Sequence, residues 1–154
     1  MGILEKQEKG AIEIEESKTE NNILRKDLTH FALKIFAENV DSEYPQKTFE
    51  TGRVFFEENN KLIEEDRLVI AKTPGNFTEL KQALDYLFRM LEINIIIEEP
   101  KVEQAHFIDG RFASIKLNEK EIGFIGEIHP KILKSWKLKM PVVLLEIRLE
   151  EIFK

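Results

Sequence analysis

Residues 113–130, ASIKLNEKEIGFIGEIHP, decide the fold class of this chain. Apolar and polar residues alternate from 113 to 117, residues 118–120 are polar, and apolar residues recur from 122 to 128 with two glycines between them. A period of two on both sides of a short polar turn predicts an antiparallel β-hairpin. The closing His129-Pro130 predicts the start of a short helix, because proline is favoured at the first helical position.

Further strands and two longer helices are predicted on either side of this hairpin. Apolar side chains recur every three or four residues in two stretches, which predicts helices at Asn22–Glu38 and Phe77–Leu91. Asn76 is expected to cap the second helix, because Glu79 follows three residues later, as in a capping box. Strands are predicted at 11–15, 47–50, 53–56, 67–71, 93–97 and 143–149. Consecutive strands with few helices between them indicate an α+β fold, with helices packed on an antiparallel sheet.

The composition describes an acidic globular domain. Its 154 residues suit a flexible N-terminal lead-in at 1–10 and a single module at 11–154. With 23 Lys and Arg against 29 Asp and Glu, the net charge of −6 argues against direct binding of nucleic-acid phosphates. The lack of cysteine excludes disulfides, thiolate nucleophiles and Cys-based metal centres. Neither an apolar run of membrane length nor a signal-peptide core is visible, so we expect a cytoplasmic protein.

No catalytic, cofactor-binding or metal-ligating constellation stands out. His30, His106 and His129 are not paired at the spacing of metal ligands. A Gly-x-Ser-x-Gly turn and a glycine-rich phosphate loop are both missing. We therefore assign no catalytic residue, no cofactor and no metal from the residues alone.

Two glutamates beside glycines in predicted strands are the remaining candidates for chemistry. Glu50 and Glu127 would serve as an acid or a base if they were buried. Arg25 and Arg111 are possible partners, and arginine holds carboxylates with two parallel hydrogen bonds. Structural ion pairs are therefore the favoured interpretation of these glutamates.

The predicted helix at 22–38 is more apolar than a surface helix needs to be. It has apolar residues on more than one side, which indicates packing against two layers or against a partner chain. The residues that would divide between the domain core and such a partner are Leu24, Leu28, Phe31, Ile35 and Phe36. The alternative, that all of them face the sheet of this domain, stays open.

Five segments of the chain match the motifs of one family in order and spacing: 23–28, 44–52, 77–81, 106–113 and 122–130. They resemble its Leu-Arg-x-x-Leu helix, its Pro-x-x-hydrophobic-Phe-Glu-x-Gly strand, the start of its second helix, its His-x-x-x-Gly-Arg-x-Ala stretch and its Gly-x-hydrophobic-Gly-Glu-hydrophobic-His-Pro signature. The family is the C-terminal catalytic-like module of the phenylalanyl-tRNA synthetase β chain, of archaeal type.

The resemblance implies a class II synthetase fold, an antiparallel sheet flanked by helices. In the family this module is a degenerate copy of the catalytic domain, while the α chain binds ATP and phenylalanine. The Phe-Arg-x-Glu motif and the glycine-rich segment with the catalytic arginine are missing here too, so the resemblance implies no catalysis by this chain alone. It implies an assembly role, in which the first helix and the neighbouring strand join the module to an α chain.

The chain departs from the family pattern in two motifs and in its length. Thr29-His30 stands where the family helix often has Pro-Gly, and Gln82 stands where a glycine often follows the second helix start. The length fits a fragment, a split-gene subunit or a free-standing paralog. The last of these would self-associate as a homodimer and bind an amino acid or an adenylate. Contact with tRNA is expected to be indirect at most.

Overall fold

The structure is a computed structural model, and it describes residues 12–13 and 23–153, so the expected lead-in lies outside the described residues. The strands are β1 (Ile12–Glu13), β2 (Ile23–Leu24), β3 (Gln46–Glu58), β4 (Lys61–Thr73), β5 (Ile96–Glu98), β6 (Phe107–Leu117), β7 (Lys120–Ile128) and β8 (Val143–Arg148). The helices are α2 (Thr29–Glu38), α3 (Phe77–Met90) and α4 (Pro130–Ser135). None of the helices in this part of the chain has the length and hydropathy needed to span a bilayer.

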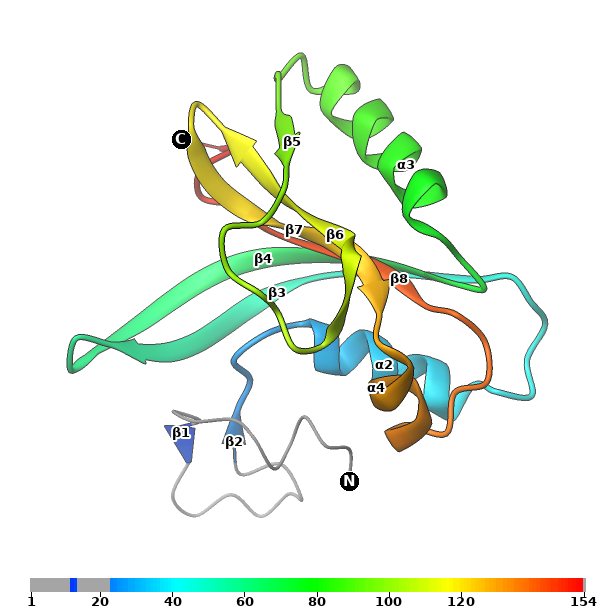
Figure 1. Cartoon of the computed structure of the whole chain (residues 1–154). Helices are drawn as coiled ribbons and strands as arrows, with labels where there is room; N and C mark the ends of the chain where they lie inside the picture. Colours follow the sequence, from blue (N-terminus) through cyan, green and yellow to red (C-terminus); the bar gives the residue numbers. More distant parts are fainter. Residues whose placement is uncertain (1–11, 14–22, 154) are drawn as a thin grey trace.

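Six strands form one sheet in the order β3-β4-β8-β7-β6-β5, and every neighbouring pair is antiparallel (Figure 1). β1 and β2 pair separately from this sheet. The α+β class and the class II-like plan of an antiparallel sheet flanked by helices are confirmed.

The hairpin predicted from residues 113–130 is present as β6 and β7. Leu117 pairs with Lys120, so the turn consists of Asn118 and Glu119 and is one residue shorter than expected. Both turn residues have positive φ, 50° and 65°, as in the type I′ turn that matches the twist of paired strands.

The two short strands predicted at 47–50 and 53–56 are one strand. β3 runs through Gly52 without interruption, because it is paired with β4 from Gln46 opposite Thr73 to Glu58 opposite Lys61. Continuous pairing with a neighbour overrides the weak β preference of glycine. The resulting β3–β4 ribbon extends well past the helices (Figure 1).

The helices cover both faces of the sheet, with α2 and α4 on one face and α3 on the other (Figure 1). Alternate residues of β8 serve the two sides: Leu144 lies in the core under α2, whereas Val143 and Leu145 lie in the core under α3. The first three residues of β8 are therefore apolar on both sides of the strand.

Helix α2 begins at Thr29, so the predicted start at Asn22 is wrong. The carbonyl oxygen of Arg25 accepts a hydrogen bond from the Phe55 N–H at 2.9 Å, which holds the chain extended beside β3. Asp27 then accepts a bond from the His30 N–H at 3.2 Å and satisfies a free amide of the first turn. The apolar spacing typical of a helix extends back to residue 22 in the sequence. The long-range backbone contact between Arg25 and Phe55 nevertheless keeps Arg25 out of the helix.

The other two helix starts are as predicted. The Asn76 side chain accepts a hydrogen bond from the Glu79 N–H at 3.0 Å at the start of α3. The Nδ1 atom of His129 accepts one from the Lys131 N–H at 3.1 Å, with Pro130 as the first residue of α4. His129 therefore acts as a structural cap.

Candidate functional site

A cleft of about 830 Å³ lies on the α2 face of the sheet. Side chains of β3, β4, β7 and β8 contribute to its lining, together with the start of α2, the segment before β6 and the start of α4. The cleft is concave and lined by several charged and polar side chains, so it is the default candidate for a functional site.

The cleft contains an arginine held between two carboxylates. The Nη1 atom of Arg67 donates to Glu146 at 2.8 Å, and its Nε and Nη2 atoms donate to Glu65 at 3.1 and 3.0 Å. Arg148 forms a longer ion pair with Glu65, 3.5 Å from Nε to oxygen. Burial lowers the pKa of Arg67, but the charges of Glu146 and Glu65 outweigh it and raise that pKa above its ordinary value. The guanidinium therefore stays charged, and it forms its hydrogen bonds with glutamates of this chain.

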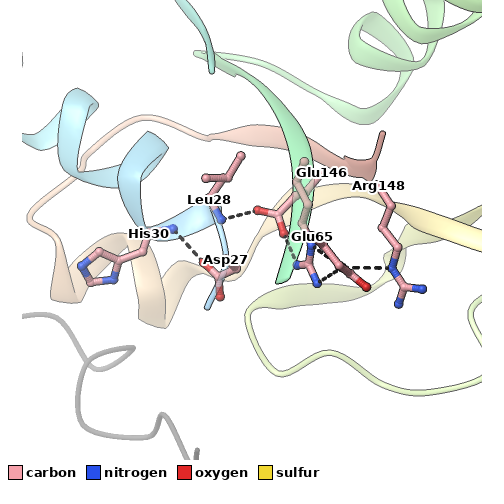
Figure 2. Close-up of polar contacts among 7 residues, drawn as sticks. Asp27, Leu28, His30, Glu65, Glu146 and Arg148 are labelled. Atoms are coloured by element: carbon pink, nitrogen blue, oxygen red, sulfur yellow. Dashed lines mark hydrogen bonds and ion pairs between the residues drawn. The ribbon is translucent and has the colours of Figure 1, made fainter. Parts of the chain in front are cut away.

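Glu146 joins three elements. Its Oε2 atom binds Arg67 of β4, and its Oε1 atom accepts a hydrogen bond from the Leu28 N–H at 2.6 Å, next to the start of α2 (Figure 2). Burial and the nearby charge of Asp27 raise the pKa of Glu146, while Arg67 and the Leu28 N–H act in the opposite direction. A buried carboxylate requires such partners, because an unpaired charge in the protein interior is strongly unfavourable.

His106 lies in the segment before β6 and also lines the cleft. Burial lowers the pKa of its imidazole, and the charge of Asp27 opposes this only in part. The ring is therefore neutral at pH 7 in the folded chain, with its centroid 4.4 Å from that of Phe107.

We expect His106 to weaken the fold in mild acid. The unfolded chain binds a proton at this histidine near its ordinary pKa of 6.5, whereas the folded chain resists it, so the free energy of unfolding falls as the pH drops below 6.5. Glu146 acts in the opposite direction, since its raised pKa lets the folded state take up a proton before the unfolded state does. Melting curves at pH 7.5 and 5.5 should show a smaller loss of Tm for His106→Gln than for the wild type. An equal loss of Tm in the two proteins would contradict the lowered pKa of His106 in the folded chain.

The five helix residues expected at an interface divide into two groups in the structure. Leu28, which precedes α2, and Phe36 are buried in the core beneath α2. Leu24, which lies in β2 and not in the helix, and Phe31 and Ile35 of α2 keep part of their surface exposed. That the second group meets a partner stays a prediction.

Both arginine–glutamate pairs expected from the sequence are present. Arg25 lies 2.6 Å from Glu50, and Arg111 lies 3.2 Å from Glu127, each measured from Nη1 to Oε1. Glu127 also accepts a hydrogen bond from the N–H of Phe77, the first residue of α3, at 3.2 Å. These contacts give both glutamates a structural role.

The sequence reading missed the cleft network because its members are far apart in the chain. Arg67 and Glu146 are separated by 79 residues. One local signal was available, since Glu146 is the single charged residue between Val142 and Ile147. A lone charge in an apolar strand indicates a buried and partnered group.

Comparison with known proteins places the chain in a family. The family model described as the phenylalanyl tRNA synthetase beta chain CLM domain matches residues 2–149. The phenylalanine–tRNA ligase beta subunit of Pyrococcus abyssi is 38% identical over 135 residues, which cover 84% of this chain and 24% of that protein. The beta subunit of Thermococcus sibiricus is 36% identical over 153 residues, covering 96% and 27%. The chain thus spans about a quarter of the length of these relatives.

Solved structures show the same fold at low sequence identity. A pyrrolysyl-tRNA synthetase structure from Desulfitobacterium hafniense superposes with a TM-score of 0.68 at 18% identity, covering 94% of this chain and 52% of that one. The fold is therefore that of a class II synthetase, and the archaeal relatives confirm the resemblance seen in the sequence motifs. Since the family model extends over nearly the whole chain, this chain belongs to the phenylalanyl-tRNA synthetase β-chain family, within its CLM domain.

Proposed function

We propose that residues 11–154 act as one non-catalytic structural module of phenylalanyl-tRNA synthetase. The module docks on a catalytic α chain and so supports the attachment of phenylalanine to tRNA. The relatives that carry this domain are beta subunits of a phenylalanine–tRNA ligase, which supports a role in the same process.

The pairing of Arg67 with two glutamates of the same chain is the observation that supports the non-catalytic part of the proposal. Activation of an amino acid with ATP requires positive charge directed at the phosphates as the negative charge shifts in the transition state. In this cleft the Arg67 guanidinium is hydrogen-bonded to Glu146 and Glu65, and it joins β4 to β8. A guanidinium that is hydrogen-bonded to two carboxylates of the same chain supports a structural role for Arg67 in the cleft.

A continuous surface of α2 and β3 supports the docking part. Arg25 connects the two elements, because its guanidinium lies 5.0 Å from the centroid of the Phe31 ring and pairs with Glu50 of β3. Phe31 and Ile35 of α2 are only partly covered. β3 is also an edge strand, and such a strand offers backbone groups for pairing with another chain. An apolar helix side next to an open edge fits a protein partner.

The docking proposal predicts a selective loss of binding for a change on this surface. Phe31→Glu should weaken binding to the α chain by at least about tenfold, as expected for an apolar contact near the centre of an interface. Titration calorimetry with the purified α chain measures the effect. Tyr86→Glu is the matched control, because Tyr86 is an exposed aromatic residue on α3, on the opposite face.

Light scattering of the chain alone and with the α chain separates the possible partners. A one-to-one complex that Phe31→Glu weakens and Tyr86→Glu leaves intact supports the proposal. A stable homodimer that does not bind the α chain would favour the free-standing paralog instead. Equal binding by both variants removes α2 from the interface.

A further inference from the structure

The helices on the two faces of the sheet begin against the same arrangement of groups. A glutamate on a central strand accepts a hydrogen bond from a backbone N–H at the helix start and pairs with an arginine. Glu146 of β8 does this for α2, through Leu28 and Arg67. Glu127 of β7 does it for α3, through Phe77 and Arg111.

The two arrangements differ in how much each helix depends on its glutamate. α3 has its own N-cap residue, Asn76, whereas the N-cap residue of α2 is Leu28, whose side chain cannot accept a hydrogen bond. Asp27 accepts a bond from the His30 N–H of α2, but the Leu28 N–H has its acceptor on β8. The bond from Leu28 to Glu146 is also shorter, 2.6 Å against 3.2 Å. Arg67 is 17% exposed and Arg111 62%, so the α2 pair is much less screened by water. Glu146 therefore supplies from β8 part of the cap that the sequence of α2 lacks.

Glu146 is also part of the cleft, so the charges there act on it. The titratable groups that line the cleft besides Glu146 are Lys26, Asp27, Arg67, Glu103, His106, His129, Lys131 and Arg148. Of these, Asp27 disfavours the ionised form of Glu146 and Arg67 favours it. The Glu146 carboxylate therefore responds to the charges in the cleft and also binds the backbone at the start of α2. Phe31 and Ile35 lie on the partly exposed side of that helix.

We propose that Glu146 is a positioning residue for the docking surface of α2. Its ionised carboxylate fixes the first turn of the helix against the sheet, so the placement of Phe31 and Ile35 depends on the charge of one group in the cleft. This inference rests on the proposed function, because it assumes that α2 docks on the α chain.

Glu146→Gln tests the proposal, because it keeps the size of the side chain and removes its charge. The charge-assisted bond to the Leu28 N–H becomes a weaker neutral one, while Arg67 keeps its bonds to Glu65. Affinity for the α chain should fall about tenfold. Glu127→Gln is the matched control, since it makes the same change at α3, and it should leave this affinity within about twofold. Equal affinities for wild type and Glu146→Gln overturn the proposal.

A spectroscopic measurement on the chain alone distinguishes this proposal from the docking proposal. In the NMR spectrum the Leu28 amide proton should lie far downfield and move upfield as Glu146 is protonated. The midpoint should lie above the pKa of an ordinary glutamate, because burial and Asp27 raise the pKa of Glu146. Glu146→Gln should abolish this titration. Where the variant does not fold, the wild-type titration decides.

The outcomes of the two experiments are separable. A Leu28 amide resonance that does not respond to pH in the wild type overturns the positioning role, whatever the α chain does. Failure of the wild type to bind the α chain, together with the expected titration, rejects the docking proposal and leaves Glu146 as the group that fixes α2.

Discussion

Replacing Leu28 with aspartate is expected to lower the free energy of unfolding by about 4 kcal/mol or more. Leu28 is 0% exposed and lies in the core beneath α2, so the change removes apolar contacts and buries a charge. The new carboxylate would also belong to a residue whose N–H already binds Glu146 and whose neighbour is Asp27, which adds repulsion between like charges. Thermal and urea unfolding followed by circular dichroism measures the loss.

Leu62→Asp is the control for this substitution. Leu62 is 56% exposed on β4, so the same chemical change there should stay within about 0.5 kcal/mol of the wild type. If Leu28→Asp melts like Leu62→Asp, the placement of Leu28 in the core is wrong.

Gly123→Ala is expected to cost about 3 kcal/mol or more. A Cβ atom at this position would lie 2.0 Å from the carbonyl oxygen of Glu146 and 2.8 Å from the Cα atom of Ile147. Both neighbours are backbone atoms of β8, and Gly123 is paired directly with Ile147, so relief requires the two central strands to move apart. The displacement would also disturb Glu146, so the Leu28 amide signal should shift in the same variant.

Gly52→Ala separates the effect of backbone crowding from the general effect of replacing a strand glycine. A Cβ at Gly52 would come equally close to another atom, 2.0 Å from Nη2 of Arg25, but that atom is at the end of a flexible side chain. We expect a cost below about 1.5 kcal/mol, mainly from loss of the contact between Arg25 and Glu50. Equal melting of the two variants would contradict the close approach of β7 and β8.

The features that the sequence predicted correctly depend on neighbours in the chain. The β6–β7 hairpin, the Asn76 cap and the Pro130 helix start each rest on residues within a few positions of one another. Local turn and capping chemistry is sufficient for these elements, because the partner of each polar group is encoded beside it.

The features that could not be predicted from the sequence depend on contacts across the sheet. The start of α2 is set by a bond from Phe55 to Arg25, and β3 is continuous only because β4 pairs with all of it. The pairing of Arg67 with Glu146 requires β4 and β8 to be neighbours, which the order of strands along the chain does not reveal. The arginine–glutamate pairs at Glu50 and Glu127 were anticipated from residue chemistry, because glutamates beside glycines in predicted strands need partners if buried and arginine binds carboxylates with two parallel hydrogen bonds.

The β3–β4 ribbon has a mechanical consequence. Thirteen residues of strand correspond to a length of about 40 Å, and the Asn59-Asn60 turn is at the far end (Figure 1). The part of the ribbon beyond β8, residues 61–66 on β4, is about 20 Å long, so a tilt of about 5° at its base moves its tip by about 1.7 Å. A fluorophore attached at Asn60, in the turn at the tip of the ribbon, would therefore report how the sheet twists when a partner binds at α2.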